Sequence, residues 1–276
     1  MTTTAPASVR AFVPTGSGLS FTGLLRSEWI KLRSVRSTIW SYATVVLISF
    51  GMALLMSVSI DFGDSPVPAD AQATLLAQAA TFGVFFGQLV VAVLGVLAIS
   101  GEYSTGMIRS SLTATPRRLP MLAAKAVVLF VCTFVVGVIT TVGSYLVAAS
   151  VLGGKGISAS LTDPDLLLPL LGGALYLALV AVFALGVGAI LRSSAGGIAA
   201  ALGIILLLPI VLPMIPAQWA TDLMAWLPGV AGQELFFWGN SVLASPFEPW
   251  QALLIMLGSG GAVLGTAAVL LMRRDA

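Results

Sequence analysis

Six apolar runs, each long enough to cross a lipid bilayer, constrain this chain more than any other feature of its sequence. A helix needs about 20 consecutive apolar residues to cross the hydrocarbon core. Strands of a membrane barrel would alternate in polarity, whereas these runs are continuously apolar. The sequence therefore predicts an all-α integral membrane protein with six transmembrane helices. The runs are Ile39–Ile60, Leu75–Ser100, Met121–Leu152, Leu166–Leu191, Gly196–Ile215 and Trp250–Met272.

The basic residues gather on one side of the predicted spans. Of the 13 lysines and arginines, all but Lys155 fall before the first run, after the last, between runs two and three, at the start of run three, or between runs four and five. The opposite side holds eight of the 11 acidic residues. Because cytoplasmic loops carry an excess of Lys and Arg, both termini are predicted to lie in the cytoplasm. The net charge of +2 is too small to indicate a nucleic-acid partner.

Three parts are predicted along the chain. Residues 1–20 are small, polar and contain Gly and Pro, which is typical of a disordered tail. Residues 21–37 form an amphipathic helix, and 38–276 form the six-helix transmembrane domain. In the amphipathic segment, bases occupy much of the face left by the apolar positions, and Glu28 precedes Lys31 by three residues, close enough to pair. Such a helix lies on the inner membrane surface, either as a topology anchor or as a contact platform.

The loop after the second run, "ISGEYSTGMIRSSLTATPRR", contains an unusual acid. Glu102 falls at the C-terminal end of the predicted second span, where the helix dipole disfavours a carboxylate. A basic partner is therefore expected, either in the N-terminal helix or at Arg109, Arg117 or Arg118. A solvated loop would explain the bases but not this carboxylate.

The fifth run and the segment after it depart from a simple span. The turn "LRSSAGG" is so short that spans four and five must be antiparallel neighbours. Prolines in "LLLPIVLPMIP" predict a bent outer end that packs against protein. The aromatic segment from Met214 to Pro249 has no Lys or Arg. It predicts short helices lying in or dipping into the outer interface, or an irregular loop packed on the helix ends.

Four stretches resemble the successive signatures of permease subunits of exporter-like type-two ATP-binding-cassette transporters of the actinobacterial type. They are "LLRSEWIKLRSVRSTIW", "GEYSTGMIRSSLTATPRRLPMLAAK", "LRSSAGGIAAALG" and "WLPGVAGQEL". The resemblance implies a multi-pass protein of the bacterial plasma membrane that pairs with a second permease copy or a paralogue. It also implies a connecting helix containing Glu28, Trp29, Lys31 and Arg33. The loop that would couple to the ATPase contains Glu102, Tyr103, Thr105, Gly106, Ile108 and Arg109.

The chain has no phosphate-binding G-x-x-x-x-G-K-[ST] motif, because its nearest match, "LGGKGIS", has Gly after Lys. The sequence therefore predicts no cofactor bound by this chain and no enzymatic activity of its own, with ATP-Mg held by separate ATPase subunits. An ion-coupled transporter or an intramembrane enzyme would need ionisable groups in the middle of its spans, and this sequence has none there. A non-transporting scaffold or sensor subunit stays open. An amphipathic or hydrophobic substrate (a lipid, peptide or antibiotic) is expected, with export implied by the resemblance.

Small-residue pairs offer candidates for close helix packing. Gly83 and Gly87, and Gly261 and Gly265, each have the four-residue spacing that lets two helices approach closely. Both pairs suit either a dimer interface or packing within one subunit, and the second use is the more common.

Overall fold

The computed structural model describes residues 20–60, 67–104, 118–237 and 246–273. Within these ranges the chain is helical and has no strand. Six helical stretches there are long and apolar enough to cross a membrane, as the sequence predicts. In order, the spans are α2 (Arg36–Ser59), α3 with α4 (Ala69–Thr81 and Val84–Ser104), α6 (Arg118–Gly153), α7 (Pro164–Leu191), a stretch beginning with α8 (Ser194–Leu202), and α13 (Pro249–Arg273).

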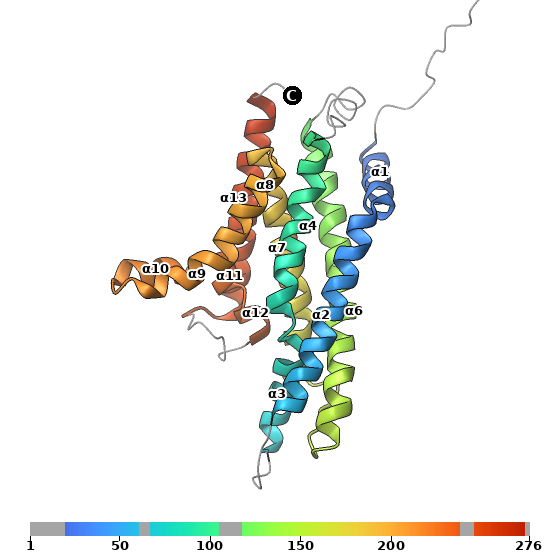
Figure 1. Cartoon of the computed structure of the whole chain (residues 1–276), viewed down its shortest axis with the longest axis vertical. Helices are drawn as coiled ribbons and strands as arrows, with labels where there is room; N and C mark the ends of the chain where they lie inside the picture. Colours follow the sequence, from blue (N-terminus) through green and yellow to red (C-terminus); the bar gives the residue numbers. More distant parts are fainter. Residues whose placement is uncertain (1–19, 61–66, 105–117, 238–245, 274–276) are drawn as a thin grey trace, which may run out of the picture.

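Helix α7 forms the centre of the bundle and packs against α4, α6, α8 and α13 (Figure 1). Its side chains Tyr176, Leu177 and Leu185 are fully buried. Small residues bring the helices together, because a Cβ at Gly95 of α4 would collide with the backbone of Ala181 in α7. Such close approach lets van der Waals contacts hold helices together where lipid is as apolar as the side chains.

The amphipathic helix α1 (Phe21–Ser34) lies at the same end of the bundle as the last turn of α4, the turn between α7 and α8, and the end of α13 (Figure 1). We call this the basic end, because Arg26, Lys31, Arg192 and Arg273 belong to these elements. The N-termini of α3 and α7 lie at the other end. Lys155, close to the end of α6, also lies there and donates to the backbone carbonyls of Ser57 and Ile60.

Helices α7 and α8 are adjacent antiparallel neighbours, as their short connection predicts. Arg192 ends α7 in the left-handed conformation, with a φ of 53°, and Ser193 caps α8 by accepting from the Gly196 amide. The positive φ turns the chain within two residues, which places α8 directly against α7.

The fifth span is bent, as its prolines predict. After α8 the chain forms a π-helix (Gly203–Leu207), then α9 (Leu208–Val211), then a 3₁₀ turn (Leu212–Met214). The predicted packing of this end against protein is found on one side, where Leu212 lies in an apolar cluster with Ala220, Met224 and Leu227. Leu207, Ile210 and Met214 are 58%, 52% and 76% exposed, and α9 and α10 (Gln218–Ala225) project away from the bundle (Figure 1). This end therefore packs against the segment that follows it, while its other side stays exposed in the single chain.

The aromatic segment forms short helices, of which two dip into the bundle. Helices α11 (Pro228–Ala231) and α12 (Glu234–Phe237) are buried along their whole length. Phe236 packs against Phe85 and Tyr176, with ring centroids 5.5 and 5.3 Å apart. Trp219 and Trp226 stay exposed on or beside α10. The segment is therefore partly exposed and partly an internal wall of the bundle.

The two glycine pairs serve different surfaces. Gly83 lies against Ser49 of α2, and Gly87 lies against Val45 and Leu177, so this pair packs the subunit's own helices. Gly261 and Gly265 have no atom near the position a Cβ would take, and both are exposed.

Candidate functional site at the basic end of the bundle

Helix α1 meets the protein through its acid and through part of its apolar side. Ser20 begins the helix by accepting from the Gly23 amide at 3.1 Å, and Lys31 in the last turn complements the helix dipole. Glu28 is the one buried residue of α1 within the described chain. Trp29, by contrast, is 49% exposed. Leu32 of the apolar stripe is partly buried and packs against the core, so the stripe is shared between the protein and the outer surface of α1.

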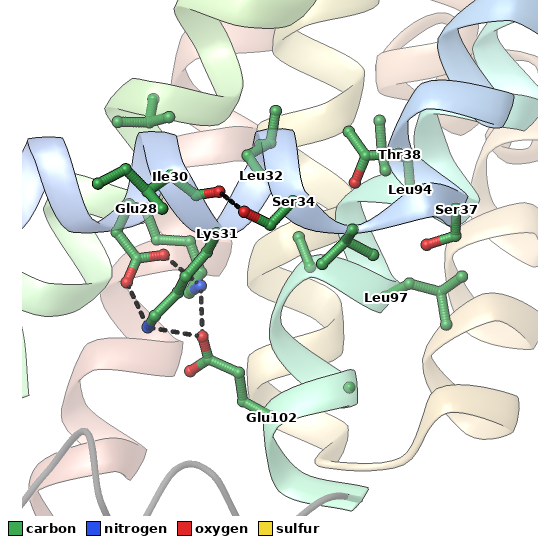
Figure 2. Close-up of a pocket in the computed structure, with 15 residues that line it drawn as sticks. Glu28, Ile30, Lys31, Leu32, Ser34, Ser37, Thr38, Leu94, Leu97 and Glu102 are labelled. Carbon is green, nitrogen blue, oxygen red and sulfur yellow. Dashed lines mark hydrogen bonds and ion pairs between the residues drawn. The ribbon is translucent and has the colours of Figure 1, made fainter.

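Glu28, Lys31, Glu102 and Lys125 form a closed ring of ion pairs between α1, α4 and α6, which we call the ion-pair ring (Figure 2). Lys31 Nζ donates to Glu28 Oε1 at 2.7 Å and to Glu102 Oε1 at 3.0 Å. Lys125 Nζ donates to Glu28 Oε2 at 2.5 Å and to Glu102 Oε1 at 2.8 Å. Each lysine thus bridges the same two carboxylates, and three helices meet at one point.

Burial makes the ion-pair ring sensitive to the loss of a member. Glu28, Glu102 and Lys125 are each 5% exposed, and only the Lys31 side chain, at 30%, reaches the surface. Removing one partner of a buried pair leaves an uncompensated charge at a cost of about 3–5 kcal/mol. Two carboxylates and two ammonium groups balance, so the intact ring has no net charge.

Lys31 stays cationic in this setting. Burial alone lowers the pKa of its ammonium group, but the hydrogen bond to Glu28 and the charge of Glu102 outweigh burial and raise that pKa above its usual value. The two carboxylates hold Lys31 in its charged form by direct hydrogen bonds. The second oxygen of Glu102, Oε2, is buried and has no hydrogen-bond partner within the described residues.

The last turn of α4 is also held from its other side. The guanidinium carbon of Arg192 lies 5.3 Å from the centre of the Tyr103 ring, which is a cation–π contact. Ser194 Oγ donates to Ser100 Oγ at 2.9 Å. The turn that contains Glu102 therefore contacts α1 and α6 on one face and the α7–α8 turn on another.

A groove of about 530 Å³ opens beside the ion-pair ring, between α1 and α4. Its lining is mainly apolar, with Leu32 and Val35 on one wall and Leu94 and Leu97 on the other (Figure 2). Glu28, Lys31, Glu102 and Lys125 line its polar part. No three His, Cys, Asp or Glu side chains gather as a metal site would require in the ranges the structure describes.

The structure brings together some of the sequence-predicted residues. Glu28 and Lys31 pair as their spacing predicts, and the basic partner expected for Glu102 is found in the N-terminal helix. Lys125 also binds Glu102, which sequence reasoning missed. Trp29 and Arg33 of α1 are exposed and outside the ring. The other predicted coupling residues, Thr105, Gly106, Ile108 and Arg109, lie outside the described residues, as do Arg117 and the side chain of Arg118.

The sequence around Lys125 contains a pattern that could have predicted its ion pairs. It is the one lysine or arginine between Arg118 and Lys155, and apolar residues surround it. A lone lysine at such a place usually has a carboxylate partner. Eight of the 11 acids lie on the opposite side of the predicted spans, so the candidate partners for Lys125 are Glu28, Glu102 and Asp275.

A family model described as "ABC-2 family transporter protein" matches residues 24–211. This range covers more than half of the sequence and includes all four members of the ion-pair ring. The chain belongs to the ABC-2 transporter family. No curated protein sequence matches this ABC-2 chain significantly.

Membership of this family gives the chain a coarse function. It is the membrane component, or permease, of an ATP-binding-cassette transporter and works with ABC ATPase subunits. Members of this family are transport subunits without an ATPase site of their own. The six apolar helices agree, since they make this ABC-2 permease a multi-pass protein of the plasma membrane.

Proposed function

We propose that the ion-pair ring is the joint through which a separate ATPase moves the membrane helices of this permease. In this proposal the basic end faces the cytoplasm, and the segment 105–117, which follows α4, meets an ATPase subunit that holds ATP-Mg. The observation that carries the proposal is the position of Glu102. It lies three residues before that segment and bonds to both α1 and α6.

The chemistry of the joint suits transmission of motion. Because Lys31 and Lys125 each bridge Glu28 and Glu102, a displacement of the α4 terminus either moves α1 and α6 along with it or separates buried charges. Separating them is costly in a low-dielectric site. Motion delivered at the end of α4 therefore passes to three helices at once.

The transport cycle proposed here is ATP-driven export by alternating access at the interface between two permease copies. The cargo is an amphipathic or hydrophobic molecule such as a lipid, peptide or antibiotic. Support for the cargo class is the apolar character of the spans, and support for export is the likeness to exporter-type permeases.

The first experiment tests assembly with an ATPase. The chain is co-expressed with the ATP-binding-cassette ATPase encoded next to it and purified through a tag on the permease. Co-elution and vanadate-sensitive ATP hydrolysis are expected. If no ATPase co-purifies with the wild type, the proposal fails at its first step.

The second experiment tests the joint. Glu102→Gln keeps the size and one acceptor but removes the charge that both lysines share. In proteoliposomes, the complex is expected to assemble while its ATP hydrolysis falls to the rate of the ATPase subunit alone. Arg26→Gln is the matched control, since it removes an exposed charge from α1 outside the ring. Permease-dependent hydrolysis at the wild-type rate in Glu102→Gln would contradict the joint.

The second permease copy is proposed to cover the bent fifth span. Prolines 209 and 213 cannot donate to the carbonyls one turn earlier, and irregular backbone at membrane depth is tolerated only against protein or a water-filled cavity. Leu207, Ile210 and Met214 nevertheless lie exposed in the single chain. A second copy packed there would supply the missing cover.

Cysteine cross-linking tests this arrangement. The chain has one cysteine, so Cys132→Ser gives a cysteine-free background. Leu207→Cys, Ile210→Cys and Met214→Cys are introduced singly, and at least one is expected to form a covalent dimer on oxidation in membranes. Leu54→Cys, exposed on α2, is the control and should stay monomeric. Dimers from Leu54→Cys alone would place the second copy elsewhere.

A further inference from the structure

The groove between α1 and α4 is a built space that the proposed joint does not use. Its volume of about 530 Å³ falls within the roughly 300–1,000 Å³ of small-molecule sites. One wall comes from a helix lying at the end of the bundle, and the other from a membrane span. A molecule that fills the groove must therefore place an apolar group against Leu94 and Leu97 and a polar group at the end where Lys31 lies (Figure 2).

The charges around the groove select the sign of the polar part. Glu28 is turned into the ion-pair ring and buried, so the outer surface of α1 presents cations without an exposed acid. Arg26 and Arg33 are exposed there, as is Arg36 at the start of α2. The ammonium group of Lys31 has three N–H donors and gives one to Glu28 and one to Glu102. Among the described residues the third donor has no acceptor of its own, which leaves it for an anion at the partly exposed side of the ring.

We propose that this groove binds one anionic phospholipid from the leaflet at the basic end. One acyl chain lies between the α1 wall and Leu94 and Leu97, and the headgroup phosphate accepts from Lys31. A lipid is the occupant that this arrangement favours, because the groove lies between an amphipathic helix and a membrane span and joins an apolar trough to a cation. A basic interfacial helix attracts anionic lipid in general, and the groove adds a defined place for one molecule.

The proposal does not depend on transport, on an ATPase, or on which side of the membrane the basic end faces. It can therefore fail while the proposed function stands, and it can hold while the proposed function fails. The experiment uses the full chain alone.

Native mass spectrometry of the purified chain gives the most direct test. Delipidated protein in detergent is titrated with phosphatidylglycerol or with phosphatidylcholine carrying the same acyl chains. One tightly bound phosphatidylglycerol is expected. Its affinity should be about fivefold above that of phosphatidylcholine, because a single cation near an anionic headgroup contributes about that factor. Equal retention of both lipids by the wild type would overturn the headgroup contact.

Two variants separate the tail from the headgroup. Leu97→Trp fills the apolar trough and is expected to abolish the tight site for both lipids. Leu54→Trp adds the same bulk to an exposed face of α2 away from the groove and should change nothing. Lys31→Gln is expected to remove the preference for phosphatidylglycerol, whereas Lys31→Arg keeps it. Arg273→Gln, which removes an exposed charge of α13 at the same end, should keep it as well.

Each departure from this pattern counts against the proposal. Retention of the tight lipid in Leu97→Trp would place it outside the groove. An equal loss of preference in Arg273→Gln and Lys31→Gln would reduce the effect to general surface attraction. Displacement of the bound lipid by millimolar inorganic phosphate would show that an anion, rather than a lipid, occupies the site. A single symmetric peak in size-exclusion chromatography confirms that each variant is folded, and Ala98→Phe replaces Leu97→Trp if the latter aggregates.

Discussion

The two ends of α4 are held by opposite kinds of contact. At its start, Phe85 lies edge-on to Phe236 and Phe237, with ring centroids 5.5 and 5.1 Å away. Nearby, the Tyr176 hydroxyl donates to Gln88 Oε1. At its end, Glu102 is held by two lysines. At its start, α4 is joined to α7 and α12 by packed aromatic surface. At its end, it is joined to α1 and α6 by ion pairs.

This difference teaches where the bundle is fixed and where it can be switched. Aromatic packing is a sum of many weak contacts, so it changes little when any one of them shifts. The ion-pair ring depends on four charges, and the loss of one leaves the others unbalanced. A signal that alters one charge or one distance therefore acts at the end of α4, while its start serves as the fixed point. Four substitutions test this comparison.

Lys125→Ala should have the largest effect. It leaves Glu28 and Glu102 buried side by side with Lys31 as their one remaining cation, at a cost of about 3–5 kcal/mol in stability. Both the thermal midpoint of the purified chain and permease-dependent ATP hydrolysis should fall. Lys155→Ala is the control, because that lysine binds backbone carbonyls at the opposite end. An unchanged thermal midpoint would mean that the ring does not hold the helices together.

Phe236→Ala should cost about 3 kcal/mol, because it opens a cavity among Phe85, Tyr176 and Phe237. Thermal unfolding measures this loss. ATP hydrolysis per folded complex should stay at the wild-type level, since the ion-pair ring is intact. A selective loss of hydrolysis at full stability would erase the distinction between the two ends of α4.

Gln88→Leu should have a smaller effect. It removes the acceptor of the Tyr176 hydroxyl but keeps the side-chain bulk, and a hydrogen bond between transmembrane helices is worth about 0.6 kcal/mol on average. A slight fall in the thermal midpoint with normal hydrolysis is expected. Tyr176→Phe is the matched variant, because it removes the donor of the same bond, and the double variant should add little to either single one.

Lys31→Ala should have a far smaller effect on stability than Lys125→Ala. Its side chain is 30% exposed, so water already solvates part of its charge, and its loss should cost less than that of a fully buried partner, about 3–5 kcal/mol. Because both carboxylates keep Lys125, the thermal midpoint should fall far less than in Lys125→Ala. Equal falls of the thermal midpoint in Lys31→Ala and Lys125→Ala would show that burial does not determine how much each lysine contributes to stability.

Much of the architecture follows from the sequence because crossing a bilayer imposes its own length and polarity on a helix. Six spans, the amphipathic helix, the bend of the fifth span and the Glu28–Lys31 pair were all predictable from local patterns. The contact of Lys125 with both carboxylates was not, because it depends on how α1 and α6 dock against α4. The burial of α11 and α12 likewise depends on room beside α7, which no local pattern reports.

The hydrogen bond between Ser100 and Ser194 has a mechanical consequence. Ser194 opens α8, and the helical chain runs from there without a loop through the π-helix and α9 to Met214. A rotation of the last turn of α4 must therefore break that bond or carry the start of α8 with it. In the second case the motion enters α8, which continues into the bent end of the fifth span.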